Sequence, residues 1–171
     1  GNHHIVVGKK FWEWGNGPEG RLWDRILTDT DGPYIELMVG AYSDNQPDYS
    51  WIQPSEVKSF RQCWYPIRDI GGVKNATREA AVNLEVEAGK TIRLGFNATS
   101  EYPDARVLLQ AGTRTLLDQR VTISPAKPFV ASLALPPDLH AESLRASLQS
   151  ADGKELVSYS PVRKEKTPLP D

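Results

Sequence analysis

Apolar and polar residues alternate along most of the chain after residue 78, and this period of two predicts short β-strands. The regular runs are 80–86, 92–98, 105–111, 129–135 and 144–148. Turn-forming residues separate them, and Asp152-Gly153 is a strong signal for a two-residue hairpin. Six or seven short strands in about 85 residues indicate an immunoglobulin-like or fibronectin-like β-sandwich, which we place at residues 79–162.

Residues 34–42 alternate in the same way and predict a strand in the first half of the chain. One face of this strand would be wholly apolar and would belong against a core: Ile35, Leu37, Val39 and Ala41. The other face places Glu36 between Tyr34 and Tyr42. Because a buried, unpaired carboxylate is costly, Glu36 must have a partner, face solvent or take part in chemistry. A solvated carboxylate on an open sheet face is equally compatible with the pattern.

Other runs rich in β-branched and aromatic residues predict further strands in the first half. These runs are 4–7, 10–14, 21–27 and 56–65. In the strand at 10–14, Trp12 and Trp14 are two residues apart and therefore point to the same side. The connection at 15–20 contains three glycines and a proline, so we expect a turn-rich loop that a ligand can approach closely. An all-β first half would offer no helix N-terminus for phosphate binding.

Composition divides the chain into two parts. All five tryptophans lie within the first 64 residues: Trp12, Trp14, Trp23, Trp51 and Trp64. The stretch 68–78 interrupts the strand patterns, so we expect one unit at residues 1–75 and the sandwich at 79–162. The first unit is small and aromatic, and we expect it to be the end of a larger sheet domain or to pack on the second. Residues 163–171 are charged and proline-bearing, which is typical of a linker to a downstream region.

Charge and cysteine content exclude several classes of partner and cofactor. The 20 basic and 22 acidic residues are nearly balanced and spread along the chain, which argues against nucleic acid. No apolar run approaches the ~20 residues that span a membrane. The single cysteine, Cys63, permits no internal disulfide; it is compatible with the cytoplasm and does not exclude the periplasm. His3 and His4 are adjacent and would point to opposite faces of a strand, so we predict that they do not bind a metal. We predict no other metal site and no other cofactor.

Carbohydrate is the ligand class that fits the first half best. The apolar faces of pyranose rings stack on aromatic side chains, and their hydroxyl groups bind carboxylates and amides. The candidate stacking residues are Trp12, Trp14, Tyr34, Tyr42 and Trp51, and the candidate hydroxyl ligands are Glu36, Asn16, Asp44 and Asn45. Each tryptophan is also compatible with core or interface packing. An acid–base role for Glu36 requires a second titrating group, and this chain offers no convincing one.

The segments Tyr34-Ile-Glu-Leu37, Asp44-Asn-Gln-Pro-Asp48 and Trp51-Ile-Gln-Pro54 resemble the closing strands of the galactose mutarotase-like β-supersandwich. Aldose 1-epimerases and several glycoside hydrolases share that sheet. The resemblance implies that Glu36 is the base that acts on the anomeric hydroxyl of the sugar, with the acid histidine upstream of this chain. Ser55-Glu56 stands where that superfamily usually has Gly-Glu.

The Trp-rich stretch 8–17, together with Trp23-Asp-Arg-Ile26, is more closely similar to an uncharacterised bacterial family. Its members precede tetratricopeptide repeats in large proteins suspected of carbohydrate processing, and the resemblance covers residues 8 to about 75. It implies that the partners of this unit are a missing N-terminal part and downstream helical repeats of the same polypeptide.

From the sequence we hypothesise that the chain is a fragment of a multidomain carbohydrate-active protein, in the first place a glycoside hydrolase. The fragment is expected to be inactive alone. In it Glu36 is catalytic and the aromatic residues bind sugar. One alternative is a non-catalytic structural or interaction module that links a sugar-binding domain to helical repeats. Another is an aldose 1-epimerase. Burial of Trp12, Trp14 and Trp51 with an ion-paired Glu36 would favour the structural module, and an open groove would favour sugar binding.

Overall fold

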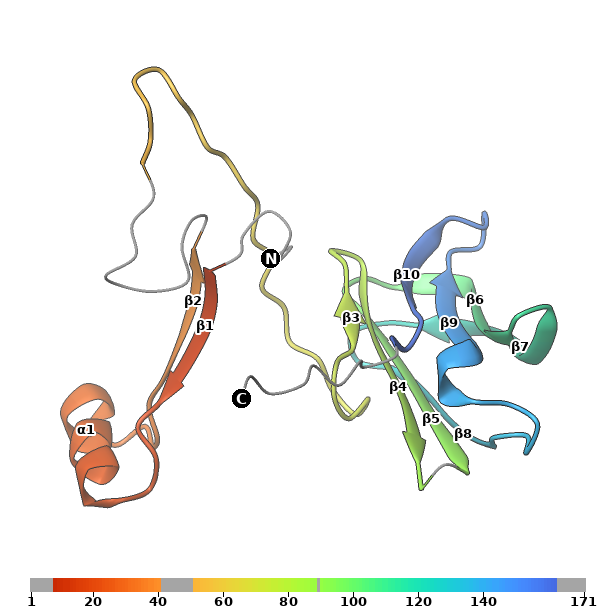
Figure 1. The fold of residues 1–171 in the computed structure, drawn as a ribbon, viewed down its shortest axis with the longest axis horizontal. Coiled ribbons are helices and arrows are strands. Elements are labelled where there is room, and N and C mark those ends of the chain that lie inside the picture. Colours follow the sequence, from red (N-terminus) through yellow and green to blue (C-terminus); the bar gives the residue numbers. More distant parts are fainter. Residues whose placement is uncertain (1–7, 41–50, 89, 163–171) are drawn as a thin grey trace, which may run out of the picture. The chain divides into compact units, whose positions relative to one another are not determined.

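The computed structural model describes residues 8–40, 51–88 and 90–162. The chain divides into two compact units, residues 1–64 and residues 65–171. The described residues form ten strands in three sheets, one α-helix and one short 3-10 helix (Figure 1). The predicted all-β sandwich class is therefore confirmed. No helix in the described ranges combines the length and the apolar character that crossing a membrane requires.

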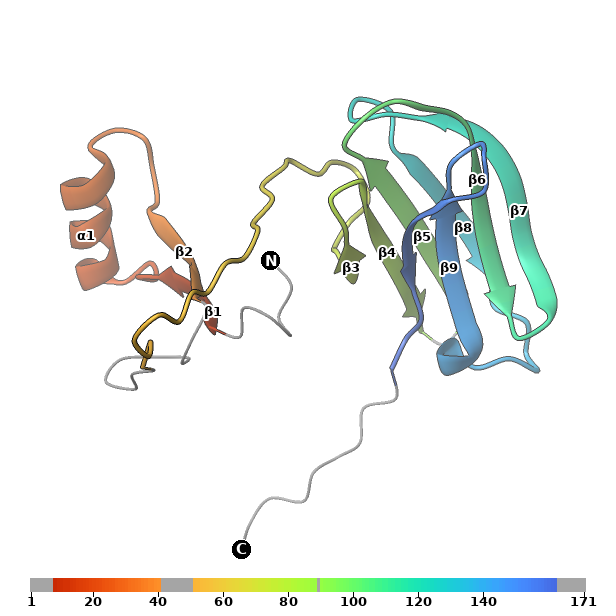
Figure 2. The same ribbon diagram turned by 90° about the horizontal axis from the view of Figure 1, so that it is seen from above.

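Two four-stranded antiparallel sheets form a β-sandwich in the second unit, where they face each other in Figure 2. One sheet consists, in spatial order, of β10 (Glu155–Tyr159), β9 (Leu144–Gln149), β6 (Tyr102–Ala111) and β7 (Arg114–Ile123). The other consists of β3 (Asn75–Ala76), β4 (Ala80–Glu87), β5 (Thr91–Ala98) and β8 (Phe129–Ala134). The 3-10 helix η1 (Ala141–Ser143) precedes β9.

Alternate residues of both sheets point between them and form the core, as the period of two predicts. The largest fully buried side chains of this core are Phe96, Ile92, Leu94, Leu109, Ile123, Leu144, Leu148, Val82, Val107 and Val157. The intervening positions of β4 and β5 form the outer face of their sheet. Four of those positions, Ala81, Asn83, Gly95 and Asn97, are nevertheless buried.

The segment 65–74, which we call the strap, covers the part of this outer face that contains Asn83, Gly95 and Asn97. Ile70 is only 5% exposed and lies against Gly95, where an added Cβ would come within 2.7 Å of the Ile70 Cβ. The Asn83 side-chain amide donates to the Ile70 carbonyl at 2.9 Å, and the Arg68 backbone N–H donates to Asn97 Oδ1 at 3.1 Å. These contacts attach the strap to the sandwich.

The first unit contains the two-stranded antiparallel sheet of β1 (Gly8–Glu13) and β2 (Ile35–Gly40), joined through α1 (Pro18–Thr28). The prediction of a strand at 21–27 is wrong, because α1 occupies these residues. Pro18 in the first turn, Glu19 near the N-terminus and Arg25 in the last turn all favour a helix. This helix also corrects the expectation that the connection is a loop in an all-β setting.

Of two further strands expected in the first half, one is absent from the described residues and the other falls outside them. Residues 51–74 of the described chain form no strand, so the prediction of one at 56–65 is wrong. Pro54 and Pro66 flank this run, and prolines lack the N–H that a sheet ladder requires. The run expected at 4–7 lies outside the described residues.

The turn between β4 and β5 holds Ala88 in the left-handed region, at φ 47°. A Cβ is unfavourable there, and asparagine tolerates this conformation better than alanine. We expect Ala88→Asn to raise the free energy of unfolding by about 0.5–1 kcal/mol, measured by urea denaturation. Ala88→Val is the control and should lower it, since β-branched residues fit this region poorly. Equal stability of the two variants would contradict the view that the left-handed backbone conformation of residue 88 is strained.

Candidate functional site

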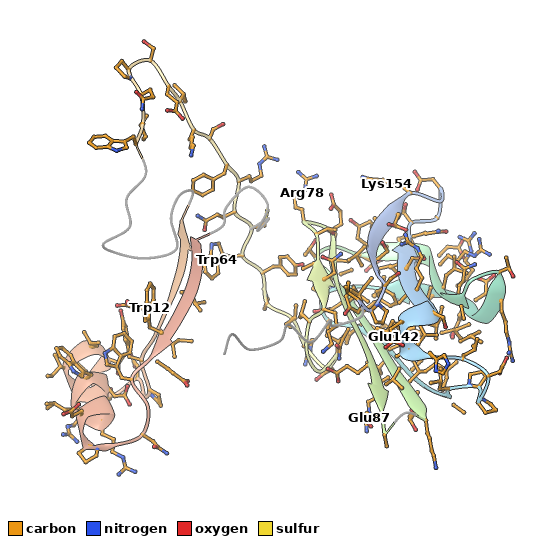
Figure 3. All side chains as sticks on the ribbon, viewed as in Figure 1. Trp12, Trp64, Arg78, Glu87, Glu142 and Lys154 are labelled. Atoms are coloured by element: carbon orange, nitrogen blue, oxygen red, sulfur yellow. The ribbon has the colours of Figure 1, made fainter. Side chains whose placement is uncertain are left out.

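The register of the hairpin brings the predicted site residues to one face. Trp12 of β1 lies directly opposite Glu36 of β2, and directly opposed residues of an antiparallel pair project to the same side. Tyr34 precedes Glu36 by two positions and Trp14 follows Trp12 by two, so both extend the same row. We call Trp12, Trp14, Tyr34 and Glu36 the aromatic–carboxylate cluster. Figure 3 shows Trp12 projecting from the hairpin.

Direct contacts hold the cluster together. The Tyr34 hydroxyl donates to Glu36 Oε1 at 3.0 Å. The rings of Trp14 and Tyr34 are tilted by 52° with centroids 5.2 Å apart, a favourable aromatic geometry. Trp12 is 37% exposed, Trp14 and Tyr34 are half-buried, and Glu36 is exposed. An apolar ring surface and a carboxylate are therefore both accessible to a ligand.

Helix α1 fixes where β2 begins. Asp24 Oδ1 accepts a hydrogen bond from the Tyr34 backbone N–H at 2.9 Å. The Thr28 hydroxyl lies 2.7 Å from the Asp24 carbonyl and 2.6 Å from the Gly32 carbonyl, which joins the end of the helix to the following turn. The helix thus positions the tyrosine that binds Glu36.

Gly20 allows the helix to approach the end of β1. A Cβ at this position would lie 2.4 Å from the Trp14 carbonyl oxygen and 2.3 Å from that of Gly15. We expect Gly20→Ala to displace α1 and lower the stability of this unit by about 1–3 kcal/mol, measured by tryptophan fluorescence during urea unfolding. Gly17→Ala is the control, because no atom lies within 4 Å of its added Cβ and only the smaller cost of losing a glycine N-cap is expected. Equal effects of the two substitutions would show that this close approach is unimportant.

The contact between Tyr34 and Glu36 has a pH signature. The hydrogen bond to the Glu36 carboxylate raises the pKa of the Tyr34 phenol above its ordinary value of 10.0. A raised pKa means that this bond contributes fully at pH values below that of the unfolded phenol and is lost as pH rises through the folded value. We expect Glu36→Gln to bring the pKa of Tyr34 back toward normal in an NMR titration of the tyrosine ring carbons. Unchanged titration of Tyr34 in that variant would contradict the contact.

Other predicted site residues do not join the cluster in the described structure. Asn16 lies in the loop before α1, where its backbone carbonyl accepts a hydrogen bond from Arg21 Nε at 3.0 Å. Trp51 is 84% exposed in a segment without regular structure. Tyr42 and Asp44 lie outside the described residues. The roles of these four residues stay predictions.

Two open hollows adjoin the cluster. One is lined by Trp12 and by residues 34–37. Because consecutive residues of β2 belong to both faces of the strand, this hollow runs along the strand edge. The other lies between α1 and the hairpin, where Trp14 and Asn16 are joined by Arg21 and Asp24. The period-two pattern of the sequence did not single out these two charged residues. Their spacing of three aligns side chains on a helix, so it becomes a signal only once residues 18–28 are recognised as helical.

The opposite face of the hairpin differs from the prediction. Ile35 and Leu37 are 50% and 51% exposed, so the expectation that this face packs against a core is wrong for the described residues. Within the same ranges, no group of three or more His, Cys, Asp or Glu side chains is placed to hold one metal ion.

The two halves of the chain match different protein families. Residues 75–159 match the sequence model of the family described as "YphG-like protein, second domain", and residues 2–67 match that of a domain of unknown function, DUF5107. A solved structure, described as an endonuclease/exonuclease/phosphatase from Beutenbergia cavernae DSM 12333, is 21% identical over 48% of this chain, with a TM-score of 0.34. This chain covers 23% of that protein, and so partial a likeness carries no functional argument.

Proposed function

We propose that the aromatic–carboxylate cluster binds a sugar ring as part of a carbohydrate-active protein. The observation that carries the proposal is the placement of Glu36 on one hairpin face beside Trp12 and Tyr34, with Trp12 directly opposite it. Aromatic rings offer flat apolar surfaces for the C–H face of a pyranose, and a carboxylate accepts hydrogen bonds from its hydroxyl groups. Glu36 forms no ion pair within the described residues, which leaves its carboxylate open to such a ligand.

The finer proposal is that this hairpin belongs to a mutarotase-like sheet in which Glu36 acts as a base. The Tyr34 hydroxyl would then fix the orientation of the carboxylate. Base catalysis needs a matching acid; apart from Tyr34, whose raised pKa makes its phenol a weak proton donor, the described residues bring no titrating side chain into hydrogen-bond contact with Glu36. We therefore propose that this chain contributes sugar contacts, and that turnover as a glycoside hydrolase or epimerase requires residues from elsewhere in the polypeptide.

Sugar titrations of the full polypeptide that carries this chain test the proposal. We expect glucose and galactose to change its tryptophan fluorescence, and Glu36→Gln to weaken that binding by about 10- to 100-fold, because a charge-assisted hydrogen bond is lost. Trp12→Ala should have a comparable effect through lost stacking. The matched control is Trp23→Ala, since Trp23 is exposed on α1 and lies outside the cluster. Wild-type affinity in both cluster variants would end the proposal.

A second candidate, a structural or interaction module, is favoured by the exposed apolar residues of α1. Leu22 and Ile26 are one helical turn apart, and both are about half exposed. A continuous apolar helix face is typical of a surface that another part of a protein covers. If this candidate is right, Ile26→Asp will disrupt packing within the full polypeptide, whereas Glu36→Gln will leave that packing and the sugar titrations unchanged.

A further inference from the structure

A groove on the sandwich lies outside the site described above. It runs over the outer face of β4, β5 and β8 and encloses about 510 Å³, which is within the usual range for small-molecule sites. The strap contributes Asp69 and Gly71 to its lining, and the sheet contributes Asn83, Glu85, Arg93 and Val130. All of these residues belong to the second unit.

The floor of the groove contains a buried acceptor without a donor. Asn83 is 3% exposed, and its Nδ2 donates to the Ile70 carbonyl at 2.9 Å. Its Oδ1 is fully buried and has no hydrogen-bond partner among the described residues. An unpaired buried carbonyl costs about 1–3 kcal/mol, so a ligand that supplies a donor would gain from reaching it.

A second acceptor faces the same space. A Cβ added to Gly72 would lie 3.7 Å from Asn83 Oδ1 and 3.8 Å from Glu85 Oε1, so the absent side chain of Gly72 leaves room beside both oxygens. Lys74 Nζ binds Glu85 Oε1 at 2.8 Å, and this bond lowers the pKa of the Glu85 carboxyl, which keeps it ionised. Two oxygens that accept hydrogen bonds thus lie beside Gly72: Glu85 Oε1 belongs to a partly exposed side chain, whereas Asn83 Oδ1 is covered, so a ligand reaches it only by displacing what covers it.

The charges of the groove are balanced. Lys74 neutralises Glu85, and Arg93 pairs with Glu87 at 2.6 Å; Figure 3 labels Glu87 at the end of β4. Asp69, the third carboxylate of the lining, pairs with Arg68 at 3.2 Å, so no carboxylate of this lining is left unpaired to attract a cation and an uncharged ligand is favoured. Val130, 58% exposed, adds an apolar wall beside these polar groups.

We propose that this groove binds a neutral polyhydroxyl ligand, of the class of mono- and oligosaccharides, through Asn83 Oδ1 and the Glu85 carboxylate. Hydroxyl groups donate to both oxygens and also accept from Lys74 and Arg93, while the C–H face of the ligand covers Val130. This site is independent of the aromatic–carboxylate cluster, and it does not rest on the function proposed for that cluster.

The test is an NMR titration of the isotopically labelled chain with glucose, galactose and maltotriose. Methylammonium serves as the cation probe. A Trp12→Ala, Glu36→Gln background removes the cluster as a competing site. We expect at least one of the sugars to give saturable shifts of the Asn83 side-chain amide and the Gly72 backbone amide, whereas methylammonium gives none. The proposal is overturned if no sugar shifts these signals, or if methylammonium alone shifts them.

Gly72→Ala separates binding from folding. Its added methyl group makes only ordinary van der Waals contacts, so the melting temperature should be unchanged, but it fills the space beside both acceptors. We expect sugar affinity to fall about tenfold or more. Glu85→Gln should also weaken binding, whereas Thr122→Ala, exposed on β7 of the other sheet, should not. Undiminished affinity in Gly72→Ala and Glu85→Gln would assign the shifts to another site and overturn the proposal.

Discussion

Replacing Gly95 with alanine is expected to detach the strap and to lower the free energy of unfolding of the sandwich by about 2–4 kcal/mol. The new Cβ would lie 2.7 Å from the Ile70 Cβ and 3.1 Å from the Ile70 Cα, and a backbone atom cannot move away without moving the whole segment. Detachment exposes Ile70 and breaks the hydrogen bonds of the strap with Asn83 and Asn97. Urea unfolding followed by far-UV circular dichroism measures the loss.

Two further variants make the Gly95 experiment specific. Gly72→Ala adds the same methyl group to the strap itself without a close contact, so its stability should equal that of the wild type. Ile70→Gly removes the obstructing side chain, and it should cost less in the Gly95→Ala background than in the wild type because the strap is already detached. Strictly additive costs would contradict a direct steric conflict between these two positions.

The sandwich was predictable because its core strands keep a strict period of two. Ile92, Leu94, Phe96 and Ala98 alternate with polar or small residues, and all four point into the core. The same alternation suggests that the outer face is solvated, and the strap instead buries Asn83, Gly95 and Asn97 on it. This burial depends on tertiary contacts of the strap, a segment that has no strand or helix pattern of its own. The pattern of the sequence could therefore not reveal it.

The sequence signals for helix α1 were present, but signals for a strand in the same residues competed with them. Tryptophan, isoleucine and leucine in a short run fit a strand, and this favoured the wrong prediction at 21–27. The spacing of four between Leu22 and Ile26, together with Pro18 in the first turn, indicates a helix. An 11-residue helix is short enough that these two patterns are hard to distinguish.

The candidate site was predictable within each strand and not between strands. Alternation alone places Tyr34 with Glu36, and Trp12 with Trp14. The pairing of Trp12 with Glu36 depends on the hairpin register, which an intervening helix sets and which no local pattern encodes. For the same reason Asp24, which binds the Tyr34 backbone, could not be assigned before the helix was known.

Truncating Phe96 to alanine is expected to be the most damaging single change considered, with a loss of about 3–5 kcal/mol. Phe96 is fully buried at the centre of β5, where it lies opposite Val82 of β4 and Phe129 of β8. Its removal leaves a cavity between two sheets whose hydrogen-bonded ladders cannot simply close over it. A loss of this size approaches the whole free energy of unfolding of a small domain.

The readout for Phe96→Ala must come from the sandwich itself, because all five tryptophans lie within the first 64 residues. Far-UV circular dichroism, or NMR of the β-sheet amides, meets this requirement. Val130→Ala is the matched control: it removes apolar atoms from the neighbouring strand β8, but at an exposed position, and should cost no more than about 0.5 kcal/mol. If both variants lose the same stability, the sandwich interior is not packed as described, and the buried side chains around Phe96 do not determine its stability.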